Sequence, residues 1–176
     1  MEYPQILSKI NTFIFDVDGV LTNGQVILQK GGEQARIMNI KDGFALQLAA
    51  KSGYRVIVIS GGKSEEVRTR FNGLGIHDVY LGASDKLEVF EEVKITYNLK
   101  EEEIAYMGDD IPDYPVMVNM GLPACPADAA QEIIAISKYV SPFKGGEGCG
   151  RDLIEKVMKA QQKWFLQSND KQAQVW

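Results

Sequence analysis

Short apolar runs alternate with longer stretches of helical periodicity along most of the chain. The runs with the character of buried strands lie at residues 12–15, 54–59, 78–81, 104–107 and 122–125. Between them, helices are predicted at residues 42–51, 63–72, 86–97, 112–118 and 127–135. This alternation is typical of an α/β fold, so we expect a Rossmann-like three-layer sandwich with a central parallel sheet.

One segment departs from the alternation. Residues 25–30 and 34–40 flank a Gly-Gly-Glu turn, a pattern that predicts a β-hairpin over about residues 24–40. Because it follows the first strand directly, the hairpin is placed either to overhang a site at the end of that strand or to pair with another subunit.

The end of the chain carries a last helical pattern. A helix is expected at about residues 151–166, and its apolar stripe consists of Leu153, Ile154, Val157, Met158 and Phe165. No repeat or linker interrupts the sequence. We therefore expect a single domain over residues 1–166 and a flexible polar tail over residues 167–176.

Composition narrows the classes of function. With 19 basic and 24 acidic side chains the net charge is −5, and no basic tract is present, which argues against a nucleic-acid partner. No apolar stretch reaches membrane-spanning length, and the first residues lack the layout of a signal peptide. Cys125 and Cys149 match no zinc spacing and are expected to be free thiols, which indicates a reducing cytoplasm.

The first apolar run leads into two aspartates one residue apart, Asp16 and Asp18, followed by Gly19. Residues i and i+2 of a strand point the same way, so both carboxylates can address one ligand at the strand end. One aspartate can attack phosphorus, while a second protonates the leaving oxygen and then deprotonates water. The alternative interpretation is a solvated turn.

A second acidic cluster, Asp109, Asp110 and Asp113, follows the apolar run at residues 104–107. At one edge of a parallel sheet the two clusters would repel each other unless a cation lay between them. Magnesium takes one or two carboxylates together with phosphate and water, so a magnesium site with Asp109 as a ligand is predicted. The alternative is a helix N-terminus whose acids favour the dipole, and Asp113 is expected to order the loop.

Two weaker signals lie between these clusters. Ser60-Gly61-Gly62-Lys63 follows the second strand and opens a helix, where backbone amides and a hydroxyl can form an anion pocket. A plain glycine turn is the alternative. Lys86 begins the helix after the third strand, where the helix dipole disfavours a lysine. A cation there would balance the carboxylates and an incoming phosphate, although most single lysines are exposed surface residues.

In this order on successive strand ends, DVDGVLT, ISGG, Lys86 and GDDIPD resemble the four motifs of the haloacid dehalogenase superfamily of phosphotransferases. The resemblance implies that Asp16 is the nucleophile and a magnesium ligand. It implies that Asp18 is the general acid/base and binds the metal through its backbone carbonyl. It also implies that Ser60 and Lys86 hold the phosphoryl oxygens and that Asp109 completes the Mg²⁺ site.

The match extends from about residue 13 to residue 143, and it indicates a member without a cap domain. Capless chains with a hairpin, a KDG segment and a glycine-rich segment ending in RD are similar to the 3-deoxy-D-manno-octulosonate 8-phosphate phosphatase family of lipopolysaccharide precursor synthesis. Members of that family form tetramers in which the hairpins build a central barrel. The resemblance therefore implies a homotetramer held by the hairpin, acting on a small sugar-acid phosphate.

One departure affects the expected substrate. Many relatives carry an arginine where this chain has Gly62. The related 2-keto-3-deoxynononate 9-phosphate phosphatases carry a glutamate there and a threonine at the position of Ser64, so the eight-carbon substrate is favoured over the nine-carbon one. Lys63 and Arg68 are candidates for the substrate carboxylate unless they belong to a solvated helix face. The predicted substrate-binding residues are Gly19, Gly61, Gly62, Lys63 and Arg68.

Two other functions share these motifs or this fold. A phosphomutase normally needs a cap that excludes water, and the chain has no segment long enough to form one. A non-catalytic oligomerisation domain would use the same fold and hairpin, but it would have no need for Asp16, Asp18, Lys86 and Asp109.

Overall fold

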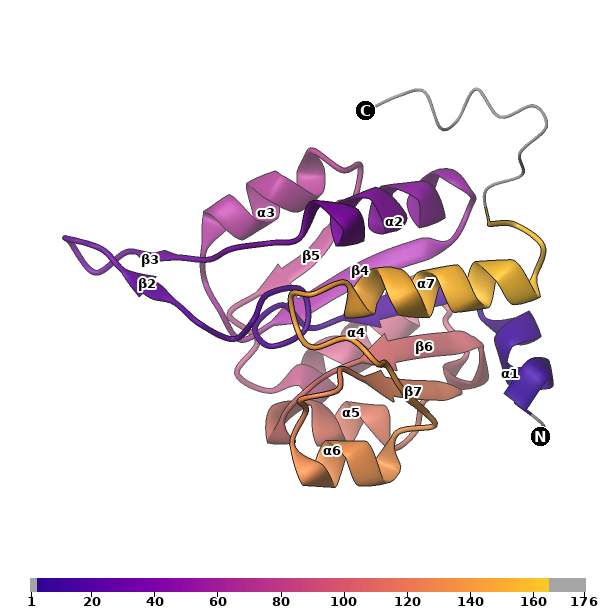
Figure 1. Cartoon of the computed structure of the whole chain (residues 1–176). Coiled ribbons are helices and arrows are strands. Elements are labelled where there is room, and N and C mark those ends of the chain that lie inside the picture. The colour runs from indigo at the N-terminus through magenta and orange to yellow at the C-terminus, as the bar shows by residue number, and fades with distance from the viewer. Residues whose placement is uncertain (1–2, 165–176) are drawn as a thin grey trace.

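Six parallel strands form the centre of the protein in this computed structural model, which describes residues 3–164 (Figure 1). Their order in the sheet is β5-β4-β1-β6-β7-β8. The bounds are Thr12–Phe15 for β1, Arg55–Ser60 for β4, Asp78–Leu81 for β5, Ile104–Met107 for β6, Leu122–Cys125 for β7 and Tyr139–Val140 for β8. Strand β1 is central, because β4 and β6 pair with it on either side along its whole length.

Helices cover both faces of the sheet, which gives the three layers of the fold (Figure 1). One face carries α1 (Tyr3–Lys9), α2 (Ile40–Lys51), α3 (Glu65–Asn72) and α7 (Cys149–Ala160). The other face carries α4 (Lys86–Tyr97), α5 (Tyr114–Met117) and α6 (Gln131–Ile136). Two short 3₁₀ turns, Glu101–Glu103 and Ile111–Asp113, lie on either side of β6.

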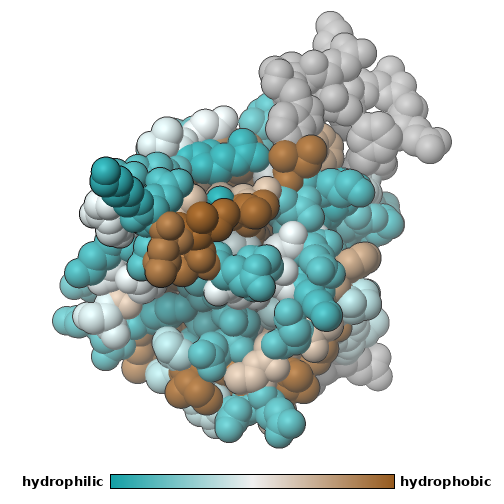
Figure 2. Space-filling model, turned by 60° about the vertical axis from the view of Figure 1, so that its left-hand side comes forward, coloured by the Kyte–Doolittle hydropathy of each residue, from teal (hydrophilic) through white to brown (hydrophobic). Residues whose placement is uncertain are grey.

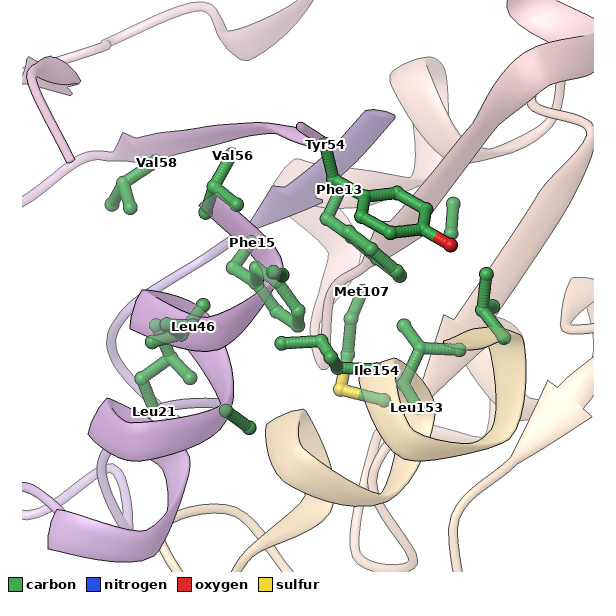
Figure 3. Close-up of a cluster of buried hydrophobic side chains, with 14 of the residues drawn as sticks. Phe13, Phe15, Leu21, Leu46, Tyr54, Val56, Val58, Met107, Leu153 and Ile154 are labelled. Carbon is green, nitrogen blue, oxygen red and sulfur yellow. The ribbon is translucent and has the colours of Figure 1, made fainter. Parts of the chain in front are cut away.

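The strands send alternate side chains into two hydrophobic cores, because successive residues of a strand point to opposite faces. In β1, Phe13 and Phe15 belong to one core and Ile14 to the other. Figure 3 shows the two phenylalanines packed among side chains of α2 and α7, including Leu46 and Ile154. All four side chains of β1 are buried, so packing fixes the strand from both faces and with it the loop that follows.

The hairpin is short and extends away from the sheet (Figure 1). Strands β2 (Ile27–Leu28) and β3 (Gln34–Ala35) pair in antiparallel fashion, and both residues of β2 are exposed. At the tip, Gly31 and Gly32 have φ angles of +99° and +88°, which glycine adopts without a Cβ clash. The hairpin thus presents apolar side chains to solvent instead of burying them in its own chain.

The predicted α/β fold and its five strands are confirmed by the structure. Helices α3, α5 and α6 begin two to four residues later than predicted, after turns at their N-termini. The hairpin strands are shorter than predicted, and residue 40 already belongs to α2. Helix α1 and strand β8 were not predicted.

The prediction for the last helix was wrong at its C-terminal end. Helix α7 begins at Cys149 and ends at Ala160. The chain leaves the helix because Gln162 has a positive φ of 56° and the N–H of Lys163 bonds the carbonyl of Met158. Phe165 and the predicted tail lie outside the described residues.

Candidate active site

Three loops meet at the carboxyl edge of the sheet. The loop after β1 carries Asp16, the last residue of β4 is Ser60, and the loop after β6 carries Asp109. Because β4 and β6 flank β1, these loops are brought together, as expected at the edge where ligands bind in parallel sheets.

Asp16, Asp109 and Asp113 form a carboxylate cluster in which one oxygen from each lies within 4.8 Å of the others. Asp16 is only 6% exposed and Asp113 only 1%. Burial, together with the charge of Asp113, raises the pKa of Asp16. Burial and the charges of Asp16 and Asp113 raise the pKa of Asp109 to about 8. The three acids repel one another in a site with little water. A divalent cation that takes oxygen ligands would offset this repulsion, so the residues fit Mg²⁺.

Lys86 supplies positive charge at this cluster. Its Nζ lies 3.0 Å from Oδ1 of Asp16 and 2.7 Å from Oδ1 of Asp113. Burial opposes the charged form, but the two carboxylates outweigh it and raise the pKa of Lys86. The side chain of Asp85 caps α4 by accepting from two backbone N–H groups, which fixes the helix start from which Lys86 projects. Lys86 is thus held in its charged form beside the predicted nucleophile.

Asp113 accepts hydrogen bonds from two groups next to the carboxylate cluster. The Tyr106 hydroxyl donates to Oδ1 of Asp113 at 2.7 Å, and the backbone N–H of Asp109 donates to its Oδ2 at 3.3 Å. A Cβ on Gly108 would lie 2.4 Å from Cγ of Asp113. Glycine at position 108 therefore lets the carboxylate fold back over the loop. This agrees with a loop-ordering role, and it also places Asp113 within the carboxylate cluster.

Gly19 allows the loops after β1 and β6 to touch. Its φ is +87°, and a Cβ there would lie 2.0 Å from Oδ2 of Asp109. From the other side, a Cβ on Gly145 would lie 2.0 Å from the carbonyl oxygen of Gly19. The glycine-rich segment before α7 therefore packs directly on the catalytic loop, and neither position has space for a side chain.

Asp42 of the KDG segment fastens α2 to α7 behind this loop. Its Oδ1 accepts from the backbone N–H of Arg151 at 2.7 Å, in the first turn of α7. Burial raises the pKa of Asp42 to about 6. The KDG segment and the glycine-rich segment ending in RD thus contact each other, although Asp42 and Arg151 are 109 residues apart in the sequence.

Asp18 does not belong to the carboxylate cluster. Its two oxygens pair with Arg36, which follows β3: Nε lies 2.6 Å from Oδ1, and Nη2 lies 3.1 Å from Oδ2. The Arg36 side chain is 9% exposed and that of Asp18 is 35% exposed. This pair connects the base of the hairpin to the loop that carries the predicted acid/base.

The loop after β4 forms a turn around Ser60. The backbone N–H of Gly62 donates to Ser60 Oγ at 3.1 Å, and that of Ala83 donates to the Ser60 carbonyl at 3.0 Å. Ser60 is buried and lies at the same edge of the sheet as Asp16. Its hydroxyl therefore has a fixed position, as a phosphate-binding group requires.

Beside this loop a cavity of about 990 Å³ separates the hairpin from the start of α3. Its walls include Arg36, Gly61, Gly62, Lys63 and Arg70. This volume suits a ligand of metabolite size. The cavity brings three of the five predicted substrate-binding residues together, and Gly19 lies on the adjoining catalytic loop.

Arg68 is placed elsewhere. Its guanidinium bonds the carbonyl of Val79 and pairs with Glu65 at 2.8 Å, and it does not line the cavity. A role in binding the substrate carboxylate stays a prediction for this residue. The sequence did not predict a place in the site for Arg36, Arg70 or Tyr106, because their contacts join segments that no local motif connects.

Two further features of the described residues concern the cysteines and the lengths of the helices. Cys125 and Cys149 are both free, as predicted, and both are buried. Between residues 3 and 164, no helix is both long and apolar enough to span a bilayer.

Comparisons with known proteins agree with this geometry. A scan against protein-family models finds no match. The chain is 35% identical over 159 residues to the 3-deoxy-D-manno-octulosonate 8-phosphate phosphatase KdsC of Yersinia pestis, covering 90% of this chain and 85% of the relative. The chain belongs to the KdsC family.

Solved structures of this family share the fold. The 3-deoxy-D-manno-octulosonate 8-phosphate phosphatase of Moraxella catarrhalis, in complex with magnesium, phosphate and KDO, matches with a TM-score of 0.88 at 30% identity; 92% of each chain is covered. A haloacid dehalogenase superfamily (subfamily III A) hydrolase from Legionella pneumophila matches with the same TM-score at 31% identity, covering 91% of this chain and 88% of that one. The resemblance inferred from the motifs is thereby confirmed.

Proposed function

We propose that this protein is a magnesium-dependent phosphatase that hydrolyses 3-deoxy-D-manno-octulosonate 8-phosphate to the free sugar acid and phosphate. The observation that carries the proposal is the buried Asp16 carboxylate, held by Lys86 at 3.0 Å within a three-carboxylate cluster. The KdsC relatives, and the Moraxella structure with magnesium, phosphate and KDO, support the substrate. The activity would serve lipopolysaccharide precursor synthesis in the cytoplasm.

In the first step, an oxygen of Asp16 attacks phosphorus and the bond from phosphorus to the sugar oxygen breaks. Asp18 gives a proton to that oxygen, so the sugar acid leaves as an alcohol. Lys86 lies beside Asp16, where its charge offsets the charge on the phosphoryl oxygens. Ser60 is placed to hold one of these oxygens through its hydroxyl.

In the second step, water attacks the aspartyl-phosphate and gives a proton to Asp18. The bond between phosphorus and Asp16 breaks, so phosphate leaves and the carboxylate returns to its starting state. Asp16 and Asp109 would hold Mg²⁺, together with the backbone carbonyl of Asp18. A bound Mg²⁺ supplies charge that stabilises the transferring phosphoryl group.

We also infer that the protein is a homotetramer assembled through the hairpin. Figure 2 shows apolar side chains gathered where the hairpin projects. The exposed large apolar residues of this region, which we call the hairpin patch, are Val26, Ile27, Leu28, Ile37 and Ile40. An exposed apolar patch of this kind marks an interaction site, and a second copy of the chain is the partner that we propose for it.

The proposed activity is tested by phosphate release from a panel of sugar phosphates, with magnesium and with a chelator. We expect magnesium-dependent release from octulosonate 8-phosphate, and slower release from nononate 9-phosphate. Turnover of the nine-carbon substrate alone would favour the alternative phosphatase. No magnesium-dependent release from either would favour a non-catalytic oligomerisation domain.

The proposed assembly is tested by light scattering after gel filtration. Leu28 is 77% exposed in β2, and Ile95 is 80% exposed in α4, outside the hairpin. We expect Leu28→Lys to reduce the tetramer to smaller species, because a lysine in an apolar interface must lose its hydration. The matched variant Ile95→Lys should remain tetrameric. Equal masses for both variants would argue against the hairpin as the interface.

A further inference from the structure

The pair between Arg36 and Asp18 is a contact that the reaction as proposed does not use, although it engages the predicted acid/base directly. Both oxygens of Asp18 are engaged by the fork of the guanidinium, at 2.6 Å and 3.1 Å. The remaining nitrogen of the fork, Nη1, donates to the backbone carbonyl of Gln34 at 3.2 Å. Arg36 is therefore held from its own hairpin while it holds Asp18.

This arrangement conflicts with the task of Asp18. A general acid must lie within hydrogen-bond reach of the leaving oxygen and present a proton to it. While Arg36 occupies both oxygens, the side chain is held toward the base of the hairpin. The pair must open, at least in part, before Asp18 can serve the substrate bound at Asp16.

Gly62 explains why a guanidinium fits beside Asp18 in this chain. A Cβ at position 62 would lie 3.3 Å from Oδ2 of Asp18 and 3.4 Å from Nη2 of Arg36. Such distances are tighter than ordinary contacts, so any longer side chain at this position would compete for the space that Arg36 occupies. Glycine at position 62 thus admits the pair.

Arg36 also lines the 990 Å³ cavity beside Gly61 and Gly62. A sugar acid bound at Asp16 through its phosphate would extend its other end into this cavity. That end carries a carboxylate, which is chemically equivalent to the Asp18 side chain as a partner for a guanidinium.

We propose that Arg36 determines specificity by exchanging Asp18 for the substrate carboxylate. In the free enzyme Arg36 pairs with Asp18. When the substrate binds, its carboxylate pairs with Arg36 in place of Asp18. The released Asp18 then turns to the leaving oxygen. A phosphate ester without a carboxylate leaves the pair closed and is hydrolysed slowly. This inference rests on the proposed phosphatase activity.

The test compares two substrates with similar leaving groups. Octulosonate 8-phosphate carries a carboxylate, and glucose 6-phosphate is a sugar phosphate without one. For Arg36→Met we expect kcat/KM on the octulosonate to fall by about 10- to 100-fold, the usual range for loss of a charge-assisted contact. On glucose 6-phosphate kcat/KM should rise, because Asp18 is no longer held.

Two further variants serve as controls. Lys30→Met removes an exposed cation from the hairpin tip, where it makes no contact with Asp18, and it should leave both values unchanged. Arg36→Lys keeps the charge without the fork and should recover part of the activity on the octulosonate. Gel filtration of each variant shows whether the assembly is intact.

The outcomes separate this inference from the proposed function. If Arg36→Met lowers both values equally, Arg36 only supports the fold, and if it changes neither, the pair is not used. No recovery in Arg36→Lys would also contradict a role for the charge. Each of these results would contradict the proposed exchange of partners by Arg36, but it would leave the proposed phosphatase activity of the wild-type protein unaffected. A wild-type protein that hydrolyses only glucose 6-phosphate would instead overturn the proposed substrate.

Discussion

Asp113 connects more parts of the site than any of the predicted catalytic residues. It accepts from the Tyr106 hydroxyl and pairs with Lys86, each at 2.7 Å, while the N–H of Asp109 reaches its other oxygen. At 1% exposure, the carboxylate has protein partners in place of water. The position of Lys86 beside Asp16 therefore depends on a residue that need not touch the substrate.

We expect Asp113→Asn to lower kcat by about 100-fold and to destabilise the fold by about 1–3 kcal/mol, because Lys86 loses a charged partner and the buried network loses an acceptor. Phosphate release and denaturant unfolding measure the two effects. Tyr106→Phe removes only the hydroxyl and should cost about 1 kcal/mol with little loss of kcat. Equal activity losses in the two variants would contradict a particular role for Asp113.

Asp16→Asn tests the nucleophile. An amide cannot form the aspartyl-phosphate, so turnover should fall at least about 10⁴-fold. The melting temperature in metal-free buffer should not fall, because the substitution removes one of the three mutually repelling carboxylates. Residual turnover close to that of the wild type would exclude Asp16 as the nucleophile.

At the scale of single residues, the sequence predicts which side chains lie at the ends of strands. Asp16 and Asp109 could be placed together because both follow apolar runs that end at the same edge of a parallel sheet. Arg36 could not, because the hairpin is anchored by few contacts and its side-chain direction depends on the space left at Gly62. Asp113 was expected to order its loop, but its contact with Lys86 joins two elements across the sheet edge.

The glycine-rich segment before α7 supports the catalytic loop by backbone packing alone. A Cβ on Gly145 would lie 2.0 Å from the Gly19 carbonyl oxygen and 2.9 Å from that of Thr22. Neither oxygen belongs to a side chain that can rotate away. The two loops can therefore pack this closely only because residue 145 has no side chain.

We expect Gly145→Ala to lower the free energy of unfolding by about 2–3 kcal/mol, because the backbone must shift to make room. The loop with Asp18 would move with it, so kcat should also fall. Gly73→Ala is the matched control, because its nearest contacts lie at 3.4 and 3.6 Å. Differential scanning calorimetry of both variants, with phosphate release, measures the difference; equal melting temperatures would contradict the packing argument.

Whole elements were predictable where burial gives a strong pattern. Strand β1 is buried on both faces and was placed at its correct bounds. Strand β8 has two residues and is defined by its pairing with β7, a contact that leaves little local signal. Helix α1 has seven residues and buries only Ile6 and Leu7, which is too short for helical periodicity to emerge.

For the molecule as a whole, the metal-free protein should lose stability as the pH rises. Asp16 and Asp109 have raised pKa values, so the folded state keeps protons that the unfolded chain releases near pH 4. Stability should therefore fall as the pH rises from about 4 through the pKa of Asp109 at about 8, where half of the Asp109 carboxyl groups in the folded state are deprotonated. Magnesium binds the deprotonated form, so its stabilising effect should grow over the same range.

We expect saturating magnesium to raise the melting temperature by about 5–10 °C at pH 8, and by much less at pH 5.5. Thermal unfolding with magnesium and with a chelator at both pH values measures this. Asp109→Asn should lose most of the increase at pH 8. An increase of the same size at both pH values would contradict the proposed coupling between protonation and metal binding.

Helix α7 is the last of the described elements to be synthesised, yet it covers the strand that is made first. Chains leave the ribosome from the N-terminus, so β1 emerges while one of its faces still lacks Leu153 and Ile154. Until residues 149–160 arrive, Phe13 and Phe15 remain partly uncovered and available to chaperones. We therefore expect chains truncated before α7 to be insoluble and inactive, because this face of β1 then lacks its cover.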